Sequence, residues 1–230
     1  MHEAVIVPSE YCYDALGRRR LPAYPLVLTN LDHVRVIVIG GGSVAERKIN
    51  GLIAGGAHPV VVSPELTPAL ETWCAKRAIT WLQRRYEPGD LAGAFLVIAA
   101  TNDHAVNMLV AAEARRHGIL ANIGDDPDKG NCTTTATVRR GDLVVAVTTN
   151  GASPALTAKI RRELEAAYGE EYAILLGMLR EIRAGRARQL PPAERTKLLR
   201  RLVEDDVLAW IRAGKIEQAW ALAQSSEDDG

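Results

Sequence analysis

The feature that most constrains the fold is a β-branched run that ends in three glycines and is followed at once by a helical pattern. Residues 34–39 are typical of a buried parallel strand. Residues 43–54 place apolar side chains at helical spacing. Between them, Gly40, Gly42 and Ala45 match the pattern G-x-G-x-x-A, in which the glycines allow a tight turn and a close approach of backbone to a pyrophosphate. This context predicts a dinucleotide-binding unit.

Strand and helix patterns continue to alternate after this unit. We expect further strands at 60–62, 96–100 and 119–123, with helices at 68–77 and 104–117. Such alternation predicts an α/β protein with a Rossmann-type, doubly wound parallel sheet. Two β-rich segments, 133–138 and 142–149, then indicate a hairpin. Beyond Ser153 the pattern is helical, and we expect helices at 155–168, 172–184, 192–203 and 206–223.

These patterns divide the chain into five expected segments. They are an N-terminal arm at 1–23, an NAD-binding Rossmann domain at 24–118, a β-rich dimerisation and active-site segment at 119–150, a small C-terminal helical domain at 151–223 and an acidic tail at 224–230.

Composition excludes several classes of function. Lysine plus arginine and aspartate plus glutamate each number 28, so no net charge attracts nucleic acid. Three separated cysteines and five histidines form no metal-binding spacing, and no resident metal is expected. No apolar run approaches the roughly 20 residues of a membrane span, and no signal peptide is apparent. We therefore expect a cytoplasmic protein without a membrane or nucleic-acid partner.

Several side chains follow the predicted strands at the edge where a dinucleotide binds. The candidate cofactor-binding residues are Gly40, Gly42, Ser43, Val44, Ser63, Pro64, Glu65, Thr101 and Asn102. Ser63 stands where an acidic residue normally meets the ribose, whereas Glu65 follows two residues later. No arginine adjoins Ser63 to hold a 2′-phosphate, which favours NAD over NADP. The alternative is a turn whose glycines serve packing alone.

Four segments in order resemble the sirohaem synthase dehydrogenase module, also known as the precorrin-2 dehydrogenase and sirohydrochlorin ferrochelatase family. They are Gly40-Gly41-Gly42-Ser43-Val44-Ala45-Glu46-Arg47-Lys48, Ala99-Ala100-Thr101-Asn102-Asp103 with Val106-Asn107, Asn122-Ile123-Gly124-Asp125-Asp126-Pro127, and residues 145–155. The similarity extends over roughly residues 24–168. It implies NAD-dependent oxidation of precorrin-2 to sirohydrochlorin, with ferrous iron as a possible further substrate for chelation to sirohaem. It also implies a homodimer, and the length leaves no room for the fused methyltransferase of larger members.

The resemblance assigns the catalytic position to Asp125. One carboxylate could take the proton released during oxidation and the pyrrole N–H protons released during metal insertion. The residues alone favour a turn at Asp125-Asp126-Pro127-Asp128, because aspartate side chains readily bond to nearby backbone. We assign catalysis to Asp125 and the turn to Asp126 and Asp128.

A tetrapyrrole substrate carries several carboxylates, so basic and helix-start groups are candidates for its pocket. The predicted substrate-binding residues are Asn122, Arg139, Arg140, Thr149, Gly151, Ser153 and Lys159, with Arg161 and Arg162 nearby. A solvated basic face is the alternative for each cation. Cys132 and Thr135 replace an aromatic residue and a proline that are usual in the family, which changes the wall of the expected pocket.

Two alternatives stay open. His104 is either a proton carrier near the cofactor or a surface residue at a helix start. The whole chain is either this enzyme or an NAD-sensing regulatory module without tetrapyrrole chemistry, because Rossmann domains serve both roles.

Overall fold

Five parallel strands form the sheet of the first of two units, residues 1–134 and 135–230, into which the chain divides. The computed structural model describes residues 23–224. The strands are β1 (Val36–Ile39), β2 (Val60–Val62), β3 (Thr80–Leu82), β4 (Leu96–Ala99) and β5 (Leu120–Ile123). Their order is β3-β2-β1-β4-β5, with each neighbouring pair parallel. The predicted Rossmann-type sheet is confirmed.

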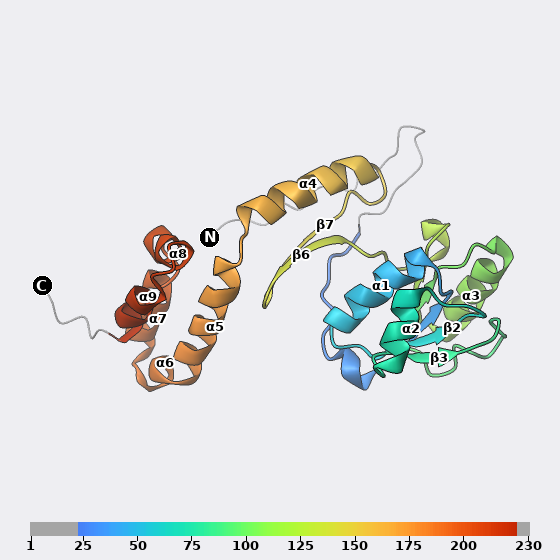
Figure 1. Ribbon diagram of the computed structural model, residues 1–230, viewed down its shortest axis with the longest axis horizontal. Coiled ribbons are helices and arrows are strands. Elements are labelled where there is room, and N and C mark those ends of the chain that lie inside the picture. Colours follow the sequence, from blue (N-terminus) through green and yellow to red (C-terminus); the bar gives the residue numbers. More distant parts are fainter. Residues whose placement is uncertain (1–22, 225–230) are drawn as a thin grey trace, which may run out of the picture. The chain divides into compact units, whose positions relative to one another are not determined.

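Helices cover both faces of this sheet (Figure 1). Helices α1 (Ser43–Ala54) and α2 (Pro68–Ala75) pack on one face, where Ile49 and Leu70 are fully buried against strand residues such as Val38. Helix α3 (His104–His117) packs on the other face through Val110 and Ala114. All four residues of β1 and of β4 are buried, as a sheet covered on both faces requires.

The sheet differs from the predicted one at one edge. Strand β3 was not predicted, because Thr80–Leu82 is a three-residue edge strand with little apolar pattern. At the other edge the strand predicted at 119–123 is present: β5 pairs with β4 along its whole length and so belongs to the sheet rather than to the β-rich segment. The division between the units lies later, between Thr134 and Thr135.

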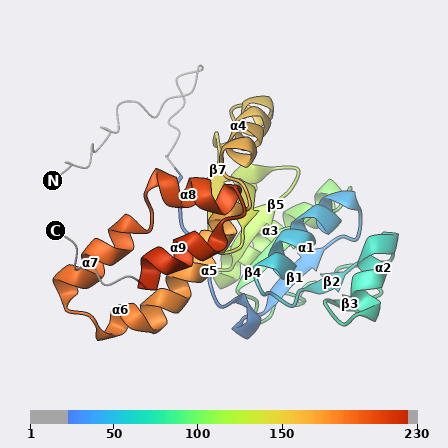
Figure 2. The same ribbon diagram turned by 60° about the vertical axis from the view of Figure 1, so that its left-hand side comes forward.

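The second unit begins with the predicted hairpin. Strands β6 (Ala136–Arg140) and β7 (Leu143–Val147) pair antiparallel, and Gly141 makes the turn with φ +57°. Helix α4 (Pro154–Ala167) follows and packs on both strands (Figure 2). The Ser153 hydroxyl accepts a hydrogen bond from the Leu156 N–H, so the predicted N-cap is confirmed.

The rest of this unit is a helical bundle with its own apolar core. Its helices are α5 (Glu171–Ala184), α6 (Arg186–Gln189), α7 (Pro192–Arg201), α8 (Asp205–Arg212) and α9 (Ile216–Gln224). Met178, Leu202 and Val207 lie in the core. The single helix predicted at 206–223 is wrong, because Gly214 adopts a left-handed conformation, φ +74°, and separates α8 from α9.

Parts of two predicted segments lie outside the described residues. The arm at 1–23 falls there except for its last residue, and so does the acidic tail after Gln224. Among residues 23–224, no helix combines the length and the apolar character that a membrane crossing needs.

Candidate active site

The three glycines of the turn after β1 occupy different environments. Gly40 has φ +114°, and a Cβ atom there would lie 2.4 Å from the Ala100 carbonyl oxygen. At Gly41 a Cβ atom would lie 2.1 Å from the Glu65 carbonyl oxygen. At Gly42 it would meet no protein atom within 4 Å. The first two glycines therefore let the turn pack against neighbouring loops, whereas Gly42 faces open space where a ligand can approach.

Helix α1 begins directly behind this open position. Gly42 is its N-cap residue and brings no side-chain hydrogen bond to the helix start. Ser43 and Val44, in the first turn, are exposed, while Ala45 is fully buried against the sheet. An uncapped helix N-terminus presents backbone N–H groups and a partial positive charge, which suit a pyrophosphate. The turn thus has the shape and the polarity for a dinucleotide.

The residues after β2 divide into one that holds the loop and two that face solvent. Ser63 is buried, and its hydroxyl donates to the Glu65 carbonyl oxygen at 2.7 Å. Its own carbonyl accepts from Trp81 Nε1 at 2.8 Å. Pro64 and Glu65 are exposed. The Glu65 carboxylate is therefore the acidic group available at the end of β2.

The turn after β4 lies against the glycine turn. A Cβ atom at Gly40 would come within 3.2 Å of the Thr101 nitrogen. The Thr101 hydroxyl donates to Asn107 Oδ1 at 2.8 Å, and Asn107 Nδ2 donates back to the Thr101 carbonyl at 3.1 Å. Asn107 is fully buried, while Asn102 is exposed. This pairing fixes the loop that borders the dinucleotide turn.

Asp125 follows β5, the strand next to β4. The backbone N–H of Gly124 donates to the Ala99 carbonyl at 2.8 Å, which joins this loop to the end of β4. Asp125 Oδ2 lies 2.8 Å from His104 Nδ1, with the carboxylate about one-third exposed. Burial alone would raise the pKa of Asp125, but hydrogen bonds from His104, from Asn107 and from its backbone N–H outweigh it and hold the pKa below the usual value. Asp125 is thus an accessible, ionised carboxylate.

The neighbouring aspartates belong to the turn. Asp126 precedes a short 3-10 helix at Pro127–Lys129, and Asp128 lies within it. Both residues therefore lie in a turn, as expected, although the Asp126 side chain caps no backbone N–H of the short helix.

Asn122 lies inside the protein rather than at the surface. Only 5% of it is exposed, and both ends of its amide have protein partners. Its Oδ1 accepts from Lys48 Nζ at 2.5 Å, and its Nδ2 donates to the Cys132 carbonyl at 3.0 Å. Lys48 also donates to Thr134 Oγ1 at 3.2 Å. Lys48 belongs to the motif that carries the family resemblance, but no sequence pattern assigns it a partner.

The other predicted substrate-binding residues lie in the second unit. Arg140 donates to the Glu165 carbonyl at 3.1 Å, and Thr149 Oγ1 donates to the Ser153 carbonyl at 3.2 Å. Gly151 has φ +78° in the turn before α4. These groups hold the hairpin and the helix start together, as does the Ser153 cap.

Two predicted cations of the second unit are exposed instead. Arg139 lies on β6, and Lys159 lies on α4, where its Nζ is 3.7 Å from Glu163 Oε1. Nearby Arg161 pairs with Glu165 at 2.8 Å. The Lys159 pair is long and exposed, so this cation is free to change partner when an anionic ligand binds.

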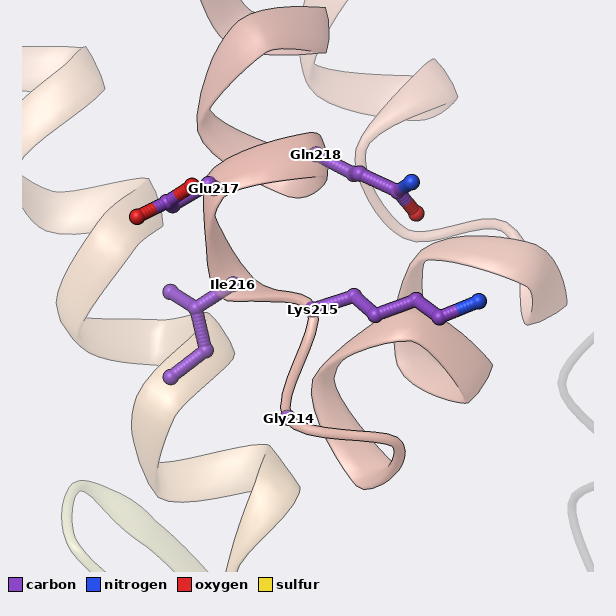
Figure 3. Close-up of a pocket in the computed structure, with 5 residues that line it drawn as sticks. All are labelled: Gly214, Lys215, Ile216, Glu217 and Gln218. Atoms are coloured by element: carbon purple, nitrogen blue, oxygen red, sulfur yellow. The ribbon is translucent and has the colours of Figure 1, made fainter.

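A surface hollow in the second unit is not a candidate site. It lies at the turn between α8 and α9, where Lys215 and Gln218 extend away from Ile216 and Glu217 (Figure 3). Side chains that diverge cannot surround one ligand. In the part of the chain that the structure describes, no three histidine, cysteine, aspartate or glutamate side chains gather to hold a metal.

Comparison with known proteins defines the class first. Residues 27–136 match the family model described as putative NAD(P)-binding, and residues 140–167 match the model of the sirohaem biosynthesis protein central segment. The first match covers the whole glycine turn and Asp125. The chain is therefore an NAD(P)-binding Rossmann protein joined to a sirohaem-biosynthesis segment.

Individual relatives agree with this class. Siroheme synthase 1 of Aeromonas salmonicida is 36% identical over 186 residues, which are 80% of this chain and 40% of that protein. Siroheme synthase of Chromobacterium violaceum is 42% identical over 142 residues, 62% of this chain and 30% of that protein. A solved structure titled "SirC, precorrin-2 dehydrogenase" has a TM-score of 0.73 and 29% identity, covering 88% of this chain and 98% of that one.

The chain is thus similar to sirohaem synthases and to a precorrin-2 dehydrogenase, in agreement with the resemblance that the four motif segments carry. It spans less than half the length of the two sirohaem synthases.

Proposed function

We propose that this protein is an NAD-dependent precorrin-2 dehydrogenase that makes sirohydrochlorin. The observation that carries the proposal is the position of Asp125, an ionised and accessible carboxylate one strand away from the loop that borders the dinucleotide turn. The name of the similar solved structure, precorrin-2 dehydrogenase, supports the same reaction.

The residues around the turn fit a dinucleotide. The pyrophosphate would lie at Gly42, Ser43 and Val44, where the structure leaves space and presents the helix start. Thr101 and Asn102 would border it on the β4 side. When bound, the cofactor supplies the hydride acceptor for the oxidation. The exposed Glu65 would meet the adenosine ribose and repel a 2′-phosphate, so we propose NAD rather than NADP.

Asp125 is the proposed base. Oxidation of the reduced tetrapyrrole leaves one proton to be removed, and the Asp125 carboxylate takes it. Its carboxylate is ionised, and therefore able to accept a proton, at neutral pH. His104, hydrogen-bonded to Asp125 Oδ2, orients the carboxylate and lies ready to take the proton onward.

Insertion of ferrous iron is a second candidate activity of the same carboxylate. Two pyrrole N–H protons must leave when a metal enters the macrocycle, and an accessible base can accept them. Ferrous iron would then be a substrate that passes through the site. This activity predicts that Asp125→Ala loses both oxidation and metal insertion.

We also propose a homodimer formed through the second unit. Among the described residues of the hairpin and α4, Val138 is the one buried hydrophobic side chain. With so little burial, the hairpin and α4 gain little stability from their own packing. A second copy of the segment would cover Val144 and Leu156, which are exposed in the single chain. Arg139 and Lys159 would then be available for substrate carboxylates.

Segment roles follow from this assignment. The Rossmann domain binds the cofactor, the β-rich segment forms the dimer and part of the active site, and the helical domain completes the second unit. Cys74 and Cys132 are free thiols, which fits a cytoplasmic location.

One assay with two arms tests the proposal. Purified protein is incubated with precorrin-2 and NAD, with and without ferrous iron, and NADH, sirohydrochlorin and sirohaem are followed by absorbance. We expect NADH and sirohydrochlorin in both arms. A folded protein that binds NADH and sirohydrochlorin but turns over no precorrin-2 would refute catalysis. Binding of NADH without any tetrapyrrole binding would favour the regulatory module.

A further inference from the structure

The amino group of Lys48 joins three segments that are far apart in the sequence. Lys48 lies in the second turn of α1, the helix that starts at the dinucleotide turn. Its Nζ donates to Asn122 Oδ1 at 2.5 Å and to Thr134 Oγ1 at 3.2 Å. The side chain is half-buried, and burial together with the adjacent Arg47 lowers the pKa of the amine. A partly buried cation with defined hydrogen-bond partners indicates a specific structural role rather than the role of an ordinary solvent-exposed lysine.

The partners of Lys48 flank the loop that carries Asp125. Asn122 lies near the end of β5, before this loop. Its Nδ2 donates a hydrogen bond to the carbonyl of Cys132, which follows the loop. Asn131 adds two side-chain bonds to β5, accepting from the Ala121 N–H at 2.7 Å and donating to the Ile119 carbonyl at 3.1 Å. Hydrogen bonds on both sides of residues 124–130 thereby connect this loop to β5, and Lys48 connects β5 to α1.

We infer that Lys48 is a positioning residue for Asp125: acting through Asn122 and Thr134, it fixes both flanks of the Asp125 loop relative to the helix that forms the cofactor turn. This inference rests on the proposed function for its catalytic consequence. Asn122, predicted as a substrate ligand, then acts as the connection between Lys48 and the loop, since both ends of its amide are already bonded.

The physical reason is the cost of leaving Asn122 without its donor. In Lys48→Met the Asn122 carbonyl stays buried but loses a charge-assisted hydrogen bond. The loop can then shift to reach another donor or water. A displacement of about 1 Å at a reacting group can lower a rate by about 100-fold, whereas cofactor contacts at Gly42 are unaffected.

The main experiment compares Lys48→Met with Arg47→Met, an exposed cation one residue earlier on the same helix. The dissociation constant of NADH is measured by fluorescence, and kcat and KM are measured with precorrin-2. For Lys48→Met we expect kcat to fall about tenfold or more, with the NADH dissociation constant and the precorrin-2 KM within about twofold of wild type. Arg47→Met should keep all three values within about twofold.

A double-mutant cycle with Asn122→Leu tests the route. If Lys48 acts through Asn122, the double variant has the kcat of the poorer single variant instead of the product of the two losses. Multiplied losses would overturn the route. Thr134→Val removes the more exposed contact alone and covers the case in which Lys48→Met does not fold; we expect about a threefold lower kcat at unchanged KM.

The reactivity of Cys132 provides a readout that needs no turnover. Alkylation by iodoacetamide is followed at the Cys132 peptide by mass spectrometry in wild type, Lys48→Met and Arg47→Met. Burial raises the pKa of the Cys132 thiol, and the Lys48 charge lowers it, so loss of the charge alone would slow alkylation. Release of the segment should instead speed it about fivefold in Lys48→Met.

The outcomes separate the two proposals. If wild-type protein oxidises no precorrin-2, the proposed function fails, yet faster alkylation in Lys48→Met still supports the positioning of the loop. Alkylation that is unchanged or slower would overturn the positioning role. So would a Lys48→Met variant whose defect lies in the precorrin-2 KM or in NADH affinity, because that result would make Lys48 a direct ligand.

Discussion

The sheet of the first unit and the hairpin with α4 in the second unit contrast in how they are buried. Every residue of β1 and β4 is buried between helices on both faces, with Val36, Ile37 and Val38 fully inaccessible. Burial of each such side chain contributes about 1.5–3 kcal/mol. In β7, by contrast, Val144 and Ala146 are exposed, and α4 has no buried residue.

This difference teaches that the two regions obtain their stability differently. The first unit closes its own apolar core, so the turn and Asp125 stand on a rigid support. The hairpin and α4 leave apolar surface that a second chain would cover. Substitutions at Asp125 or in the glycine turn should therefore impair catalysis or cofactor binding without weakening the proposed dimer. Substitutions on the exposed apolar surface of the hairpin and α4 should weaken the dimer without impairing cofactor binding.

Asp125→Asn should produce the largest effect. The amide keeps the size of the side chain but cannot accept a proton, so we expect kcat for precorrin-2 oxidation to fall by roughly 100- to 10,000-fold. NADH affinity and the molecular mass in solution should not change. Steady-state kinetics, fluorescence titration and light scattering measure the three quantities.

Asp126→Asn is the matched control for Asp125→Asn. It should keep kcat within about threefold of wild type, because Asp126 belongs to the turn. Equal losses in both variants would show that the turn as a whole is needed and that Asp125 is not the base.

The double variant Val144→Asp, Leu156→Asp should have the next largest effect. Two carboxylates on surface that a partner would cover should weaken the proposed dimer by about 100-fold or more. NADH binding per chain should stay unchanged, because the sheet is complete in one chain. Light scattering across a concentration series gives the dissociation constant.

Val203→Asp controls for the added charge in that experiment. Val203 is exposed near the end of α7, in the bundle of the same unit, and its substitution should leave the dimer intact. A wild-type protein that is monomeric at all concentrations would refute the dimer and the interpretation of the exposed hairpin.

The adjacent glycines give a smaller and more local test of the first unit. Gly42→Leu meets no protein atom and has an ordinary backbone conformation, φ −86°, so its melting temperature should stay near wild type. Its side chain fills the space of the pyrophosphate, and NADH should bind at least about tenfold more weakly.

Gly41→Ala should behave in the opposite way. Its methyl group would lie 2.1 Å from the Glu65 carbonyl oxygen, so the variant should lose stability before anything else. The two melting curves and two titrations are compared directly. Wild-type NADH affinity in the Gly42→Leu protein would show that the cofactor does not bind at this turn.

The local part of the fold could be predicted because neighbours in the sequence determine it. The strand before Gly40, the turn and the start of α1 depend on β-branched residues, on glycine and on helical spacing. The cap at Ser153 is also local. The need for glycine at position 41 could not be predicted, because the motif allows any residue there. The need arises from the nearby carbonyl of Glu65, which is distant in the sequence.

The unpredicted parts depend on contacts between distant segments. Glu113 occupies a stretch that is typical of a solvated helix face, yet it is buried and accepts hydrogen bonds from Tyr86 and from the backbone of Gly89 and Leu91. The partners of Lys48 are 74 and 86 residues away. The sequence is compatible with two roles for His104, and the fold brings Asp125 to it. No periodicity carries such information.

His104→Asn should have the smallest effect and tests the electrostatics of the base. The His104 hydrogen bond helps to lower the pKa of Asp125, so its loss should raise that pKa. The carboxylate is the active form; therefore the acidic limb of the kcat profile should move to higher pH. At neutral pH the rate should change only a few-fold, while at acidic pH the variant should lose most of its rate.

His117→Asn, at the other end of α3, controls for the loss of a histidine from the same helix. Its acidic limb should coincide with that of wild type. If His104→Asn also leaves the limb in place, Asp125 does not depend on this hydrogen bond, and the proton takes another path. If the limb moves to lower pH, the titrating group is not the Asp125 carboxylate, since removing a bond that favours ionisation cannot make an acid stronger.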